Sequence, residues 1–141
     1  MDARPTLTDL LGIDTRPASG QMIGLGSDNT LYTVSGTGLA APLCPLVTDP
    51  ADLTAPYTAL PTGASFGVGF NPVPDRLRVI ASTGLNLRIN AIPNASGQCL
   101  VITDTAISGA TSISGASYTN TIPGAGSTAL YAVDSGADNF V

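Results

Sequence analysis

Residues 11–35 read LGIDTRPASGQMIGLGSDNTLYTVS, and residues 66–90 read FGVGFNPVPDRLRVIASTGLNLRIN. The two stretches align without a gap when the first is moved 55 positions along the chain, from 11 to 66. The matched pairs include Gly12 with Gly67, Ile13 with Val68, Pro17 with Pro72, Leu25 with Ile80 and, further on, Cys44 with Cys99. Because glycine, proline and apolar positions coincide, the pattern predicts an internal repeat.

A third, shorter copy follows these two. Its residues 115–118 (GASY) resemble residues 67–70 (GVGF), and its residues 130–133 (LYAV) align with residues 77–80 (LRVI). We therefore expect one β-repeat domain over residues 1–141, with copies at about 10–64, 65–112 and 113–141.

Each copy is expected to contain four strands. Short apolar or alternating runs predict the strands, and segments rich in Pro, Ser, Asp, Asn and Gly predict the turns. Four strands at a period of about 50 residues are typical of a propeller blade. The sequence therefore predicts an all-β fold of β-propeller-like repeats, each a four-stranded antiparallel sheet, with two full blades and a partial third. A plain β-sandwich is the alternative.

The chain of 141 residues contains no Lys, Glu, His or Trp. Its five cations are all Arg and its ten acids are all Asp. Without His, Ser-His-Asp and Cys-His catalysis are excluded, and without Lys so is a P-loop. Two cysteines cannot form a four-thiolate zinc site. We identify no catalytic residue and no metal-ligand set, and we favour a non-catalytic protein.

The surface is weakly charged and acidic, with a net charge of -5 and a pI near 4.1. Nucleic-acid binding depends largely on Lys and Arg, so we expect no nucleic-acid partner. Apolar runs are short and interrupted by Pro or Gly, so no membrane span is expected. No signal peptide is visible at the start of the chain. The low charge and the Ser- and Thr-rich composition nevertheless favour an extracellular or cell-surface protein.

The densest charge cluster is formed by Asp75, Arg76 and Arg78, with Arg88 on the next expected strand. These arginines could bind a carboxylate or sulfate group of a ligand. In the structural alternative, Asp75 caps the turn at Pro74 and the arginines pair with nearby Asp residues. If Arg78 and Arg88 flank each other across a hairpin, an acid or a ligand must lie between them, because like charges opposite each other destabilise a sheet.

A second polar group, Asp14, Arg16 and Asn71, belongs to the expected first strands. In a propeller that strand lines the central channel, so these side chains could face a pore. Asp and Asn oxygens at such a place could hold a Ca²⁺ ion. No other cofactor is expected.

Cys44 and Cys99 are consistent with one disulfide in an oxidising compartment. Their equivalent positions in the repeat argue against a disulfide between them. Equivalent outer strands of neighbouring blades usually lie further apart than the roughly 7 Å between Cα atoms that a disulfide allows. A disulfide between them, buried free thiols and bonds between chains all stay open at this point.

Seven segments together resemble one known family. They are residues 11–17, 20–22, 31–34, 66–72, 75–79, 86–90 and 118–120, and the most specific string is FNPVPDRLRV at residues 70–79. Over residues 10–141 the chain resembles the bacterial domain-of-unknown-function family numbered 4394. The resemblance implies a secreted, propeller-like repeat protein and no established activity. The family usually has an acid where Gly69 stands and an aromatic residue where Thr15 stands, so no shared site is carried over.

These observations favour an extracellular structural or adhesive protein that self-associates into an oligomer or filament. An incomplete set of repeats leaves strand edges and apolar faces unpaired, and copies of the same chain can cover them. The alternative is a small-molecule- or metal-binding propeller fragment, hydrolytic in one form, that uses Asp14, Asn71 and the arginines. A third possibility is a module that recruits another protein.

Overall fold

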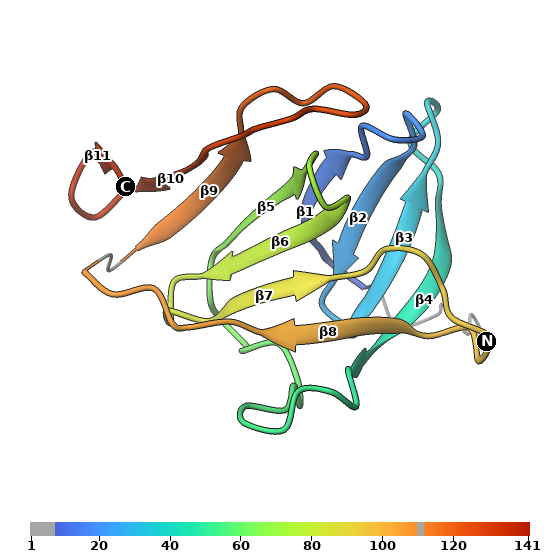
Figure 1. Cartoon of the computed structure of the whole chain (residues 1–141). Helices are drawn as coiled ribbons and strands as arrows, with labels where there is room; N and C mark the ends of the chain where they lie inside the picture. Colours follow the sequence, from blue (N-terminus) through green and yellow to red (C-terminus); the bar gives the residue numbers. More distant parts are fainter. Residues whose placement is uncertain (1–7, 110–111) are drawn as a thin grey trace, which may run out of the picture.

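The computed structural model describes residues 8–109 and 112–141, and within them the chain is all-β (Figure 1). The part of the chain described contains no helix long and apolar enough to cross a membrane. The first repeat holds β1 (Leu10–Thr15), β2 (Met22–Gly26), β3 (Thr30–Val34) and β4 (Ala40–Thr48). The second holds β5 (Phe66–Asn71), β6 (Arg76–Ala81), β7 (Asn86–Ile89) and β8 (Cys99–Thr103). The last strands are β9 (Ile113–Tyr118), β10 (Leu130–Asp134) and β11 (Asn139–Phe140).

Two hairpin turns at equivalent positions of the predicted repeat have similar backbone angles. Asn29 in the β2–β3 turn has φ 60°, and Gly84, 55 positions later in the β6–β7 turn, has φ 92°. Both angles lie in the left-handed region, which Asn and Gly tolerate better than other residues. Equivalent turns therefore set equivalent hairpins in the two repeats.

The two four-stranded units form one sheet, in the order β1-β2-β3-β4-β8-β7-β6-β5. Every pairing in it is antiparallel except the central one, where β4 and β8 run parallel. The prediction of separate propeller blades is therefore not what the structure shows. The reason lies in β4, which pairs with β3 as far as Pro45 and then with β8 over Leu46, Val47 and Thr48.

A disulfide joins Cys44 and Cys99 at this junction, with their Cα atoms 5.6 Å apart. The expected distance between outer strands was wrong, because β4 and β8 are neighbours in one sheet. Both cysteines are buried, so the bond lies in the core.

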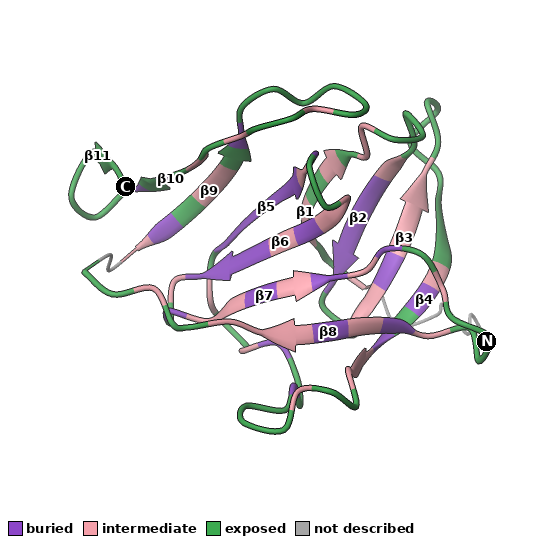
Figure 2. Cartoon of the chain, in the orientation of Figure 1, coloured by how far each residue is buried: buried purple, intermediate pink, exposed green. Residues whose placement is uncertain are grey.

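The eight-stranded sheet curls until its two end strands meet, which makes it nearly closed and barrel-like. A Cβ placed on Gly12 in β1 would lie 2.4 Å from Cγ2 of Val68 in β5, so only glycine fits there. A carboxylate oxygen of Asp14 accepts the backbone N–H of Phe70 at 2.7 Å and ties the same two strands together. The enclosed core contains the fully buried side chains of Leu25, Leu31, Phe70, Leu77, Leu87 and Ile89 (Figure 2).

The small sheet, ordered β11-β10-β9, packs on the outer face of β5 (Figure 1). Gly67 allows the close approach, because a Cβ there would lie 2.7 Å from the Cβ of Ala116 in β9. Ile80, Ile113 and Ala132 form a second, smaller apolar cluster between the two sheets. The third copy therefore covers the outer face of the second.

Candidate functional site

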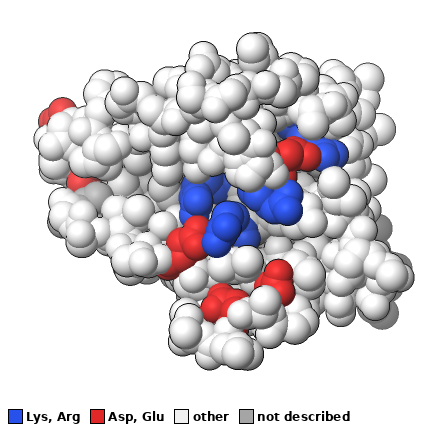
Figure 3. Space-filling model, viewed as in Figure 1, with Lys and Arg blue, Asp and Glu red and all other residues white. Residues whose placement is uncertain are grey.

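Basic side chains gather on the outer face of β6 and β7, beside acidic ones (Figure 3). Arg78 and Arg88 are directly opposite each other in this hairpin, as the sequence suggested. The group between them is Asp104, just beyond the end of β8. One of its oxygens binds Nη1 of Arg78 at 2.6 Å, and the other binds Nη2 of Arg88 at 2.9 Å. The acid required by the two opposed arginines is thus supplied by the chain itself.

Two further groups hold Arg78 in place. Its Nε donates to the Tyr118 hydroxyl at 3.2 Å, and its Nη1 donates to Oδ1 of Asn86 at 2.9 Å. Burial acts to lower the pKa of Arg78, but hydrogen bonds to Tyr118 and Asp104 outweigh it and raise that pKa above its usual value. Burial likewise acts to raise the pKa of Asp104, and the hydrogen bonds from both arginines leave it lowered. Both groups therefore stay charged.

Arg16 and Asp75 form a second ion pair, which joins the β1–β2 turn to the β5–β6 turn. Nε of Arg16 donates to the two carboxylate oxygens of Asp75 at 2.9 and 3.1 Å, and Nη2 also contacts Oδ2. The hydrogen bond from Arg16 lowers the pKa of Asp75. The backbone of Asp75 itself has φ 53°, which lies in the left-handed region. This ion pair therefore connects the turn after the first strand of one predicted repeat to the equivalent turn of the next.

The polar residues expected to face a channel are bound to backbone groups. Besides the bond to Phe70, Asp14 accepts the N–H of Thr15 at 2.8 Å. The side-chain oxygen of Asn71 accepts the N–H of Val73 at 3.1 Å and shapes the turn after β5. Within the described ranges, no three His, Cys, Asp or Glu side chains come together as metal ligands would. Asp14 and Asn71 therefore each hold backbone groups, Asp14 in β1 and β5 and Asn71 in the turn after β5.

Arg76 is the arginine whose guanidinium contacts backbone carbonyls. Its Nη1 donates to the carbonyl oxygens of Pro74 and Asp75, each at 3.0 Å. Together with Arg88, Asn90 and Asp49 it lines a pocket of about 160 Å³, floored by side chains of β8. This pocket is the place where the predicted arginines could meet a small anion.

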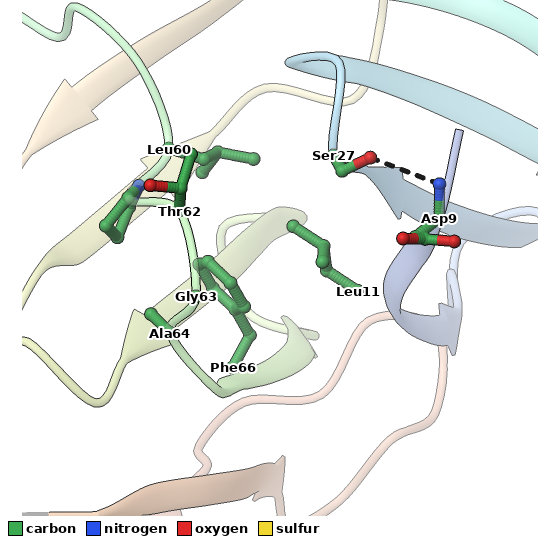
Figure 4. A pocket seen from close by; sticks show the side chains of 9 residues that line it. Asp9, Leu11, Ser27, Leu60, Thr62, Gly63, Ala64 and Phe66 are labelled. Carbon is green, nitrogen blue, oxygen red and sulfur yellow. Dashed lines mark hydrogen bonds between the residues drawn. The ribbon is translucent and has the colours of Figure 1, made fainter. Parts of the chain in front are cut away.

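A larger pocket, of about 320 Å³, lies between the start of β1 and the loop before β5. In Figure 4, Asp9 and Ser27 lie on one side, Thr62, Ala64 and Phe66 on the other, and Leu11 between them. Ser27 accepts the backbone N–H of Asp9 at 3.1 Å. Asp9 is the single charged residue among the described residues of this lining.

Two residues of the arginine cluster were not predicted. Asp104 carries the cluster and is the repeat equivalent of Asp49, but it was not singled out as a site residue, and Tyr118 was noted only as a position of the third copy and of the family resemblance. The available signal was the hairpin register, since Leu87 pairs with Thr103 and brings the next residue close to Asn86. Counting outward from the turn between β7 and β8 would have found Asp104.

The described residues form an all-β fold in which Arg16, Arg78 and Arg88 pair with acids of the same chain. The chain belongs to the family described as domain of unknown function (DUF4394), whose model matches residues 5–141. No curated protein and no solved structure matches it significantly.

Proposed function

We propose that this chain is an extracellular structural or adhesive β-repeat protein that self-associates with copies of itself. The observation that carries the proposal is the outward face of the small sheet. Tyr131 and Val133 of β10 are exposed on it, and Phe140 of β11, which pairs with Val133, is exposed beside them. Monomeric proteins rarely leave large contiguous apolar patches uncovered, and such patches commonly mark protein interfaces.

The disulfide supports the extracellular part of the proposal. Disulfides persist in oxidising compartments and are rare in the cytosol. The Cys44–Cys99 bond is buried and joins the two large repeats, so it is a structural element of the core.

Propeller-like ancestry is the finer part of the same proposal. The first strands of the repeats, β1, β5 and β9, lie next to one another in that order, as the inner strands of successive blades do. The fold differs from a propeller in that the outer strands β4 and β8 are paired with each other.

Multi-angle light scattering coupled to size-exclusion chromatography tests self-association directly. At micromolar concentration we expect a mass above 14.1 kDa that rises with protein concentration. A compact species of 14.1 kDa at every concentration would contradict the proposal.

A second function is favoured by one specific observation, the pocket of Arg76, Arg88 and Asn90. We propose that it binds a small carboxylate or sulfate. Sulfate should then raise the melting temperature more than chloride at equal ionic strength, and Arg76→Gln should reduce that difference to the part that the general exclusion of sulfate from protein surfaces produces. An equal effect of the two salts on the wild-type protein would exclude the site.

A further inference from the structure

The strands β1, β5 and β9 pack face against face in a row, although no two of them are paired as neighbours in a sheet (Figure 1). The two close contacts in this row involve equivalent positions of the repeat. Gly12 of β1 receives Val68 of β5, and Gly67 of β5 receives Ala116 of β9. In the repeat alignment Gly12 is equivalent to Gly67, and Val68 is equivalent to Ala116. In both contacts a glycine of one repeat leaves room for an apolar residue of the next repeat.

The residue opposite each glycine is covered in the same way. Leu25 pairs with Gly12, and its repeat equivalent Ile80 pairs with Gly67. Their exposed fractions are 0 % and 1 %. Ile80 is covered by Ile113 at the start of β9. An equivalent apolar residue beside the glycine is therefore buried wherever a following repeat is present.

The third repeat presents the same surface without a cover. A Cβ placed on Gly115, the equivalent of Gly12 and Gly67, would meet no atom within 4 Å. Val133, which pairs with Gly115 and is the equivalent of Ile80, is 40 % exposed. Val133 and Phe140 also line a hollow of about 290 Å³. We call the surface of Gly115, Val133 and Phe140 the socket face.

The matching projection lies at the other end of the row, on β1. Ile13 is the equivalent of Val68 and Ala116, and it is 50 % exposed. Leu10 has the position in its copy that Ile113 has in the third, and it is also exposed. A bulge between Leu10 and Gly12 brings Leu10 and Ile13 onto one side, where both approach Gly24. We call Leu10 and Ile13 the plug face.

We propose that the plug face of one copy docks on the socket face of a second copy. Ile13 then packs against Gly115 as Val68 packs against Gly12, and Leu10 covers Val133 as Ile113 covers Ile80. The occupant is a second copy because the interface continues one that the chain already forms twice within itself. Such a head-to-tail contact uses two different surfaces, and so it builds rings or filaments rather than symmetric pairs. The inference rests on the self-association proposed above and names its surfaces.

Two charge-introducing variants test the proposal. Ile13→Asp removes only the plug and Val133→Asp only the socket, and both positions are exposed enough for the chain to fold. Each variant alone should have a mass of 14.1 kDa under conditions in which the wild-type protein assembles. An equimolar mixture should form dimers of twice that mass, because each variant keeps the surface the other lacks. Ile92→Asp, on the exposed β7–β8 loop, is the matched control and should assemble normally.

The outcomes separate this interface from self-association in general. If the wild-type protein stays monomeric, both proposals fail. If it assembles and Ile13→Asp assembles as well, the plug and socket are wrong while self-association stands. As a second measurement, oxidation of a mixture of Ile13→Cys and Gly115→Cys should give a disulfide-linked dimer of the two variants. Formation of the same dimer with Ile92→Cys in place of Ile13→Cys, or no linked dimer in either mixture, would overturn the docking geometry.

Discussion

Arg78 and Arg88 face each other across the β6–β7 hairpin, and the carboxylate of Asp104 binds both, since its Oδ2 accepts from the two guanidinium groups and its Oδ1 from Arg88. Two like charges in directly opposed positions would repel each other without it. Asp104 is mostly covered, with 26 % of its side chain exposed, so solvent screens these contacts less than those of a surface pair. The cluster is therefore a structural element that depends on a single acid.

Replacing Asp104 by Asn should destabilise the fold. The amide keeps the shape but loses the charge that holds two cations, and we expect a loss of about 1–2 kcal/mol in the free energy of unfolding, between the values for exposed and buried pairs. Urea denaturation measures it. The control is Asp138→Asn in the exposed β10–β11 turn, which should change stability by less than about 0.5 kcal/mol. Equal midpoints for both variants would show that the bridge contributes nothing.

Stability should fall in acid. The pKa values of Asp75 and Asp104 are lowered below the usual 3.8, chiefly through hydrogen bonds from arginine. A lowered folded-state pKa means that the unfolded chain binds more protons at low pH. The stabilisation is therefore complete above about pH 5 and is lost as the pH falls through 3.8 and below. Urea midpoints measured across this range should drop for the wild-type protein, and less steeply for Asp104→Asn.

Asp52 should also contribute to the dependence of stability on pH, independently of Asp75 and Asp104. Hydrogen bonds from backbone amides, the one from Thr103 first, also lower its pKa. An Asp75→Asn/Asp104→Asn double variant should therefore keep part of the acid dependence. If the single variant Asp104→Asn loses stability in acid as steeply as the wild-type protein, the assignment to Asp104 is wrong.

The repeat predicted the strands well because strand and turn signals are local. Each full copy was expected to contain four strands, and the structure has four in each, β1–β4 and β5–β8. How the units join is not a local property. It depends on Leu46–Thr48 running past β3 to pair with β8, a feature without a signature in the repeat period.

The candidate site was predicted in part for the same reason. The opposition of Arg78 and Arg88 follows from one hairpin, whose register the turn fixes. Asp104 lies 26 and 16 positions away from these arginines, beyond the end of another strand. Arg16 contacts Asp75 because the whole sheet curls and brings two distant turns together, and this contact could not be predicted from one hairpin. Sequence patterns alone do not contain that information.

Removing the disulfide should cost more than any single ion pair. Cys44 and Cys99 close a loop of 55 residues, and the chain-entropy relation gives a loss of about 4 kcal/mol for a loop of that size. We expect the double variant Cys44→Ala/Cys99→Ala to show a markedly lower melting temperature by differential scanning calorimetry. The oxidised wild-type protein heated without reductant is the control, and an unchanged melting temperature would mean that the β4–β8 pairing holds the units together without the bond.

The glycine contacts along the row of first strands give the most selective test. Gly12→Ala places a Cβ 2.4 Å from Cγ2 of Val68, so the seam between β1 and β5 must open or distort. Overpacking of this kind typically costs about 1–3 kcal/mol. Gly115→Ala is the matched control, since its Cβ would meet nothing within 4 Å among the described residues, and it should change the free energy of unfolding of the monomer by less than about 0.5 kcal/mol.

The double variant Gly12→Ala/Val68→Ala separates crowding from a glycine-specific backbone effect. Val68→Ala removes the two methyl groups that approach Gly12, although its own Cβ, 2.9 Å from the added one, stays. The double variant should therefore lose less stability than the sum of the two single variants, and the difference is the coupling energy of the contact. Strict additivity would mean that the Gly12–Val68 contact does not close the sheet.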